Sequence, residues 1–255
     1  MSRVGAEEAA VAEALHRAAV YRLLGGSLAY PVRAQLDELA RLAETAAEAP
    51  PARADAREPL RLFAEAARAA EDAAVAQEYV FLFDRQVRCP PYEGAWGDAP
   101  QLAGKAALLA DVAGFYAAFG LEPGAARPDA EDHLAAECEF MSALCLKEAY
   151  ALAQGMAEGL EVTRRAQSSF LAEHLGCWAE AFAGAVKDST PLSYYGTLGD
   201  LVATWIGAEI EALGVEPRRV SGRFAYDPVQ EEEAFTCPMA APAEPAGEAP
   251  PDASP

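Results

Sequence analysis

Residues 129–141, DAEDHLAAECEFM, combine side chains that can exchange protons or pair with cations with side chains that are typical of a core. If Asp129 is the N-cap of a helix here, the acidic residues of the first turn complement the positive end of the helix dipole. Asp132 and His133 then lie in that first turn. Because the first turn of a helix often borders a cleft, we expect a ligand to reach both side chains.

The apolar face of this predicted helix includes one carboxylate. At about 100° per residue, the face holds Leu134, Cys138, Met141 and Cys145 and is widened by His133, Phe140 and Leu144. Glu137 lies on this face, whereas Glu139 points away. A carboxylate on an apolar face is costly unless it is hydrogen-bonded or neutralised. Glu137 therefore needs a partner, which is either His133 one turn earlier or a donor or cation from another helix or a ligand.

The same residues allow an enzyme as an alternative, all-helical and dependent on a metal or small molecule, that uses the region of Asp132, His133 and Glu137. A di-iron bundle requires two Glu-x-x-His motifs, and the sequence has a single match, at residues 13–16. A nucleophile elbow of the GxSxG type is absent as well. We therefore predict no catalytic residue, no metal ligand and no cofactor.

Residues 84–100, DRQVRCPPYEGAWGDAP, are predicted to form a loop because prolines and glycines interrupt any periodic pattern. The loop carries two aromatic residues, Tyr92 and Trp96. Long loops inside compact domains often bind something, but the two rings could equally pin the loop to the body of the protein. The sequence leaves both interpretations open.

The rest of the chain predicts an all-α, single-domain helical bundle. Alanine is abundant and β-branched residues are sparse, which favours helices. Breaks at proline and glycine clusters delimit the expected helices, including 79–83 (YVFLF) despite its β-propensity: 7–24, 31–47, 58–83, 101–119, 129–155, 162–186 and 192–213. Pro59 is expected in the first turn of its helix.

Charge and composition divide the chain into residues 1–226, the helical domain, and residues 227–255, a tail that we expect to be disordered. The tail has seven acidic residues, no Lys or Arg, and too few large apolar residues for a core. The formal net charge of the whole chain is −20. Nucleic acid is therefore excluded as a partner, and a basic partner is favoured.

The sequence predicts a cytoplasmic protein. Acidic residues stand near the N-terminus where a secretory signal needs positive charge. No apolar run reaches the length of a membrane span, about 18 residues. Five cysteines without CxxC spacing indicate reduced thiols rather than disulfides or a metal site.

Three motifs together resemble the TorD/DmsD/NarJ family of redox-enzyme maturation chaperones. They are Tyr-x-x-Leu-Phe, a loop with Pro-Tyr-Glu, and Asp-His-Leu-x-x-Glu-x-Glu-Phe-Met. The matching residues are Tyr79, Leu82 and Phe83, then Pro91, Tyr92 and Glu93, then Asp132, His133, Leu134, Glu137, Glu139, Phe140 and Met141. The likeness covers about 210 residues. Gly94 replaces a serine of the family pattern, and Glu131 replaces a proline.

This resemblance implies a chaperone that binds the twin-arginine leader or the apo form of the catalytic subunit of a molybdenum-cofactor oxidoreductase until the cofactor is inserted. It also implies a monomer or a helix-swapped dimer. We expect the negatively charged and aromatic residues of the motifs to contact the client, namely Tyr92, Glu93, Trp96, Asp132 and His133. We expect the remaining ones to support them, namely Tyr79, Phe83, Pro91, Glu137, Phe140 and Met141.

Overall fold

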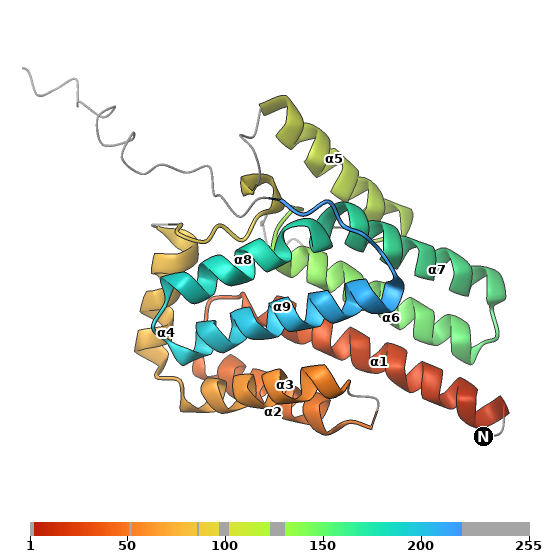
Figure 1. The fold of residues 1–255 in the computed structure, drawn as a ribbon, viewed down its shortest axis with the longest axis horizontal. Helices are drawn as coiled ribbons and strands as arrows, with labels where there is room; N and C mark the ends of the chain where they lie inside the picture. The colour runs from red at the N-terminus through yellow and green to blue at the C-terminus, as the bar shows by residue number, and fades with distance from the viewer. Residues whose placement is uncertain (1–2, 51–52, 86, 97–101, 123–130, 221–255) are drawn as a thin grey trace, which may run out of the picture. The chain divides into compact units, whose positions relative to one another are not determined.

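The computed structural model describes residues 3–50, 53–85, 87–96, 102–122 and 131–220, all within one compact unit, Met1–Ala225. Every regular element within these residues is a helix, which confirms the all-α prediction (Figure 1). The α-helices are α1 (Arg3–Ser27), α2 (Arg33–Glu48), α3 (Ala54–Ala69), α4 (Asp72–Tyr79), α5 (Leu102–Ala118), α6 (Leu134–Ala153), α7 (Ala157–Phe170), α8 (Gly176–Ser189) and α9 (Ser193–Leu213). Three short turns are η1 (Val80–Asp84, π), η2 (Glu93–Ala95, 3-10) and η3 (Leu171–Leu175, π). The predicted tail from residue 227 onward lies outside the described residues.

Helices α1 and α6 form the most extensive helix pair, and α9 packs with α8 and α3 (Figure 1). The α1–α6 approach is close at Gly25, where a Cβ atom would stand 3.1 Å from the Ala135 carbonyl oxygen. Large aromatic side chains fill the core between the helices, including the fully buried Trp178 and Trp205. Burial of such apolar surface is the main stabilising contribution to a bundle of this kind.

The start of α6 differs from the prediction. The helix begins at Leu134, and its N-cap is His133 rather than Asp129, which lies outside the described residues. The reason is local: the Ala135 N–H donates to His133 Nδ1 at 3.0 Å. The His133 imidazole therefore caps the helix, a role that was expected of the Asp129 carboxylate. The predicted apolar face of α6 is confirmed, because Leu134, Cys138 and the rest of its side chains are buried.

Two other helix predictions were wrong at their ends. Pro59 lies inside α3 rather than in its first turn, because the helix already begins at Ala54. The expected helix 58–83 is divided between α3 and α4, and residues 79–83 pass from the end of α4 into the π-turn η1. The expected helix 162–186 is α7 and α8, joined by η3. A π-turn inserts one extra residue per turn and so rotates the faces that follow it.

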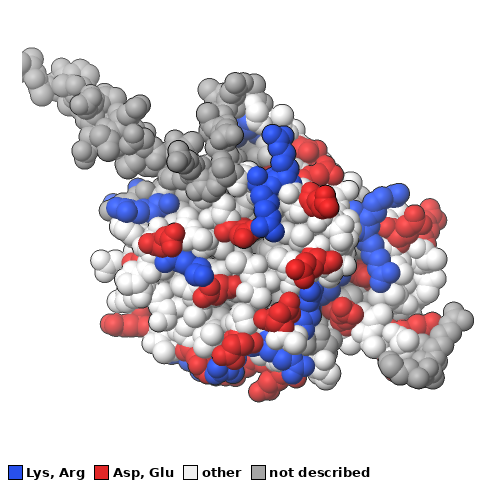
Figure 2. Space-filling view, viewed as in Figure 1, with Lys and Arg blue, Asp and Glu red and all other residues white. Residues whose placement is uncertain are grey.

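Charged residues on the face shown in Figure 2 lie interspersed, with acidic and basic side chains side by side among uncharged ones. No helix within the described residues combines the length and the hydropathy that a membrane crossing requires. Cys89, Cys138, Cys145 and Cys177 are free thiols, as predicted, and Cys237 lies outside the described residues.

Candidate functional site

The turn η2 and the start of α6 are joined by backbone hydrogen bonds. Tyr92 and His133 form an isolated antiparallel bridge. The Glu93 N–H donates to the Asp132 carbonyl oxygen at 2.9 Å, and the Leu134 N–H donates to the Pro91 carbonyl oxygen at 2.8 Å. Residues that are about 40 positions apart in the chain therefore form one junction, which brings the second and third motifs together.

Asp132 and His133 lie beneath this junction, so the expectation that a ligand reaches them from a cleft was wrong. Their exposed fractions are 0% and 5%. Asp132 Oδ2 accepts the Gly94 N–H at 3.0 Å, and the Tyr92 ring packs edge-on against His133. A Cβ atom at Gly94 would stand 3.0 Å from the same Asp132 oxygen, so a serine at this position would have to share the space with Asp132.

Trp96 pins the loop to the body of the protein, which is one of the two roles that the sequence allowed. Its Nε1–H donates to the Pro90 carbonyl oxygen at 2.9 Å, and its ring stacks with Trp178 of α8. Tyr92 is half-buried. The loop thus presents one partly accessible ring, and the second ring forms part of the core.

Glu137 is fully buried, as its place on the apolar face predicted. The donor comes from another helix: Trp178 Nε1–H donates to Glu137 Oε2 at 3.2 Å. Burial, followed by the negative charge of Glu93, raises the pKa of the Glu137 carboxyl well above its usual range. The raised pKa favours the neutral form of Glu137, which explains how the carboxyl is tolerated among apolar side chains.

Glu93, Asp132 and Glu137 together form a buried group that we name the acid cluster. His174 of η3 adjoins it, a residue that the sequence analysis missed. His174 Nδ1 is 3.1 Å from Glu93 Oε2, and His174 Nε2 is 3.5 Å from Asp111 Oδ2 on α5. Burial by itself would lower the pKa of His174, but the hydrogen bond and charge of Glu93 and the charge of Asp111 outweigh burial and raise it.

Three buried polar atoms of this region have no hydrogen-bond partner among the described residues: Asp132 Oδ1, Glu137 Oε1 and His174 Nε2. Buried polar groups in folded proteins nearly always have a partner, so such atoms indicate a place where a donor can enter. The described residues include no group of three or more His, Cys, Asp or Glu side chains that could hold a metal ion. The arrangement is suited to hold a proton or an organic cation.

The predicted supporting residues surround the acid cluster and the loop. The Phe140 ring packs against Phe170 of α7, and the Phe83 ring packs against Phe182 of α8 and Tyr195 of α9. Met141 and Pro91 are buried, and Tyr79 packs edge-on against Phe83. These contacts pack η1 against α8 and α9, and α6 against α7, although they do not test whether the region binds a client.

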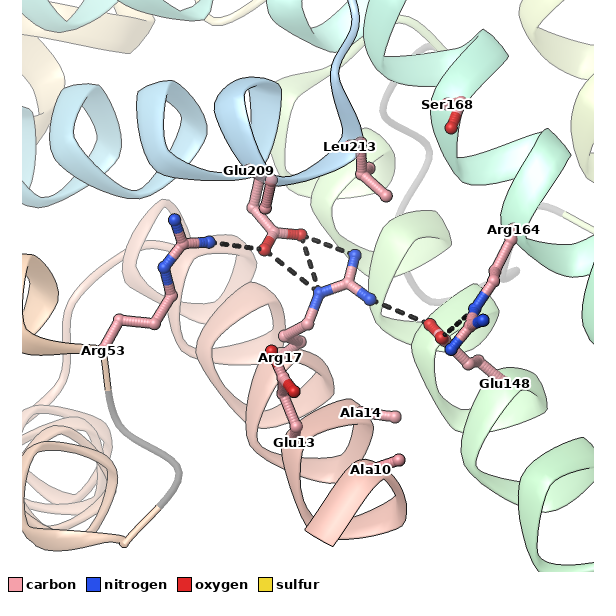
Figure 3. A pocket seen from close by; sticks show the side chains of 11 residues that line it. Ala10, Glu13, Ala14, Arg17, Arg53, Glu148, Arg164, Ser168, Glu209 and Leu213 are labelled. Atoms are coloured by element: carbon pink, nitrogen blue, oxygen red, sulfur yellow. Dashed lines mark hydrogen bonds and ion pairs between the residues drawn. The ribbon is translucent and has the colours of Figure 1, made fainter. Parts of the chain in front are cut away.

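A second buried cluster of charges, which the sequence did not predict, is centred on Arg17 of α1 (Figure 3). Arg17 Nη2 donates to Glu209 Oε2 of α9 at 2.7 Å, and Arg17 Nη1 donates to Glu148 Oε2 of α6 at 2.8 Å. Glu148 also accepts from Arg164 of α7, and Glu209 accepts from Arg53. The cluster connects four helices that are distant in sequence, and its signal in the sequence is only an arginine on an otherwise apolar helical face.

A pocket of about 400 Å³ opens beside Arg17, between α1, α6, α7 and α9. Its charged lining consists of Glu13, Arg17, Arg53, Glu148, Arg164 and Glu209. In Figure 3 the Arg17 guanidinium lies between the two buried carboxylates, and Arg53 and Arg164 approach them from opposite sides. The arginines and glutamates of the lining balance one another, so the pocket favours neither an anion nor a cation.

Comparison with known proteins gives the family. Residues 27–184, more than half of the chain, match the family model described as nitrate reductase delta subunit. The chain belongs to the nitrate reductase delta subunit family. This match confirms the resemblance that the three motifs indicated. The whole acid cluster and His174 lie within the matched residues.

Three similar proteins within this comparison are named as assembly chaperones. The perchlorate reductase assembly chaperone protein of Dechloromonas aromatica (strain RCB) is 31% identical over 113 residues, 44% of this chain and 50% of that protein. The chlorate reductase assembly chaperone protein of Ideonella dechloratans is 33% identical over 118 residues, 46% and 58% of the two chains. The selenate reductase assembly chaperone protein of Thauera selenatis is 34% identical over 113 residues, 44% and 56%. The chain spans about half the length of these curated relatives.

Proposed function

We propose that the protein is an assembly chaperone for the catalytic subunit of a molybdenum-cofactor oxidoreductase. It binds the twin-arginine leader or the apo form of that subunit in the cytoplasm until the cofactor is inserted, and it catalyses no reaction of its own. Family membership and the names of the three relatives support the chaperone role. The leader as the contact is what the family resemblance implies, and the negative charge of the acid cluster is compatible with it.

The acid cluster is the observation on which this proposal depends. Glu93, Asp132 and Glu137 lie close together, and two of their oxygens have no hydrogen-bond partner among the residues that the structure describes. An arginine side chain offers five N–H donors in a planar fork that suits carboxylate oxygens. A leader with paired arginines followed by an apolar stretch therefore matches the cluster together with the half-buried Tyr92.

The binding residues proposed from the sequence are Tyr92, Glu93, Trp96, Asp132 and His133, and their burial refines how they act. Tyr92, the N-cap of η2, is half-buried and is assigned direct contact with the client, and the buried Glu93 is assigned the negative charge with which the client's cation pairs. Asp132, His133 and Trp96 are buried and hydrogen-bonded within the junction, so they contribute by holding η2 in place.

Isolation of the bound client from the native host tests the proposal. Tagged full-length protein is purified under native conditions, and its partners are identified by mass spectrometry and analysed for molybdenum. The expected result is an oxidoreductase catalytic subunit without its cofactor at about one equivalent. Recovery of no such subunit, or of the cofactor-loaded form alone, would contradict the proposal.

Matched variants connect this result to the site. Glu93→Gln removes one negative charge at η2 and is expected to reduce recovery of the client. Glu139→Gln removes an exposed charge from the same helix as Glu137 and is expected to leave recovery unchanged. Equal loss with both variants would show that net charge, rather than the acid cluster, governs binding.

A further inference from the structure

His174 occupies a position between a buried carboxylate and a surface carboxylate. Its Nδ1 atom is 3.1 Å from Glu93 Oε2 on η2, and its Nε2 atom is 3.5 Å from Asp111 Oδ2 on α5. The His174 side chain is 3% exposed, whereas that of Asp111 is 64% exposed. The imidazole ring therefore connects the acid cluster to the surface through α5.

The rings around His174 fix its orientation. Phe115 of α5 packs edge-on against the imidazole, and Phe170 of α7 lies tilted against it. An imidazolium ion has two N–H groups that point in opposite directions. Held in this orientation, its Nδ1 is hydrogen-bonded to Glu93, whereas its Nε2 has no hydrogen-bond partner among the described residues and lies 3.5 Å from Asp111 Oδ2 as a charge pair.

We propose that His174 is the counter-cation of the acid cluster in the client-free protein, and that a guanidinium group of the client binds by displacing it from Glu93. This inference rests on the proposed function. A guanidinium can donate two parallel N–H groups to the Glu93 carboxylate, whereas the imidazolium offers that carboxylate one. His174 thus acts as a positioning and specificity residue: it keeps Glu93 paired until a group with more donors arrives.

Displacement of His174 from Glu93 is expected to release a proton from the imidazolium. In the client-free protein Glu93 and Asp111 stabilise the charged imidazolium and raise the pKa of His174. A guanidinium beside Glu93 cancels that stabilisation and adds a like charge, so the pKa of His174 falls and a proton is released. Client affinity is then expected to rise with pH through the range in which His174 loses its proton, by up to about tenfold per pH unit for one proton.

Other titratable groups face His174 and contribute to the same equilibrium. Glu93 approaches from η2, Asp111 from α5, and Glu173 is adjacent on η3. Glu137 of α6, with its raised pKa, can release a second proton when a cation enters the cluster. The contribution of His174 must therefore be measured as a difference between the wild type and a variant.

Calorimetric titration measures that difference. The probe is a synthetic peptide with two adjacent arginines followed by apolar residues, titrated at pH 6.5 in buffers of different ionisation enthalpy. The number of protons released per peptide is the slope of observed enthalpy against buffer enthalpy. The wild type is expected to release more protons than His174→Gln, and the difference is expected to lie between about half and one proton per peptide. In His174→Gln the affinity is also expected to depend less on pH.

Controls separate this inference from the proposed function. Asp111→Asn, at an exposed position, is expected to lower the pH at which affinity rises, even if His174→Gln does not fold. Glu161→Gln on the exposed surface of α7 is expected to change nothing. Equal proton release by wild type and His174→Gln, or an unshifted pH profile in Asp111→Asn, would overturn the role of His174. Absence of peptide binding to the wild type at every pH would instead overturn the proposed function.

Discussion

Glu137 and Arg17 show two ways in which a charged side chain is accommodated in this bundle. Glu137 is buried close to Glu93 and Asp132, and its raised pKa favours its neutral form. Arg17 keeps its charge. Burial by itself would lower the pKa of its guanidinium, but the hydrogen-bonded charge of Glu209 is among the effects that outweigh burial and raise it. Glu137 therefore makes the free energy of unfolding depend on pH. Arg17 makes it depend on the presence of the paired carboxylate of Glu209.

Glu137→Gln is expected to stabilise the protein more at pH 8 than at pH 5. The pKa of Glu137 is raised in the folded state, so the wild type gains stability from this group only where the carboxyl is protonated. As pH rises above the unfolded pKa, which is about 4.3, the unfolded chain ionises more readily and wild-type stability falls. Glutamine cannot ionise, and its carbonyl oxygen still accepts from Trp178.

Urea unfolding of both proteins at pH 5 and pH 8 measures this difference. Each unit by which the folded pKa exceeds the unfolded one corresponds to about 1.4 kcal/mol. The exposed Glu139→Gln serves as the control and is expected to show the same difference from wild type at both pH values. A Glu137→Gln difference that does not change with pH would mean that Glu137 is ionised in the folded protein.

Helical periodicity was sufficient to predict that Glu137 is buried, because a 100° rotation per residue depends on sequence alone. Its donor Trp178 was not predictable, since that contact requires the packing of α8 on α6. The accessibility of Asp132 was predicted wrongly for the same reason. The turn η2, which covers Asp132, lies about 40 positions away in the chain. Its place over Asp132 depends on the bridge between Tyr92 and His133.

At the level of the helices, the type of each element was easier to predict than its ends. Alanine-rich composition and apolar periodicity specify helices throughout the described residues. The ends depend on single atoms: His133 Nδ1 begins α6, and α3 continues past Pro59. The π-turns η1 and η3 were not predicted, because an inserted residue leaves no local compositional signal. These turns nevertheless determine which way His174 faces, since His174 lies within η3.

The Arg17 cluster is expected to make a large contribution to how α1 is held against α6 and α9. Arg17→Met leaves Glu209, which is 0% exposed, with Arg53, 3.4 Å away, as its one remaining cation among the described residues. Removing one partner of a buried ion pair typically costs about 3–5 kcal/mol. We expect Arg17→Met to lower the free energy of unfolding by that amount, as measured by urea denaturation at pH 7.

A second substitution separates the two possible causes of this loss. In the double variant Arg17→Met with Glu209→Leu, no uncompensated carboxylate remains at α9, so part of the lost stability is expected to return. The control is Arg61→Met, which breaks exposed pairs with Glu58 and Glu65 and is expected to cost much less, because solvent screens exposed ion pairs. If Arg17→Met costs no more than Arg61→Met, the cluster does not hold these helices together.

For the whole molecule, negative charge is expected to act on a basic client in two different ways. The net charge of −20 acts over a distance and attracts basic partners in a manner that salt screens. The acid cluster acts at short range and selects among cations by geometry. The family match covers both the loop and α6, which is where the second and third motifs meet in space. The tail from residue 227 onward adds acidic charge but is expected to add no selectivity.

Titration of paired-arginine peptides into the protein tests this account most directly. Three peptides of identical apolar sequence are compared, with the pair Arg-Arg, Lys-Lys or Gln-Gln, against the full chain and a chain that ends at residue 227. We predict that both chains bind one Arg-Arg peptide per protein. The Lys-Lys peptide is expected to bind about tenfold or more weakly, because a guanidinium pairs with carboxylates through two donors and an ammonium does not. The Gln-Gln peptide is expected to bind little. Equal affinity for Arg-Arg and Lys-Lys, or binding that is lost with the tail, would contradict the claim that the acid cluster selects the client.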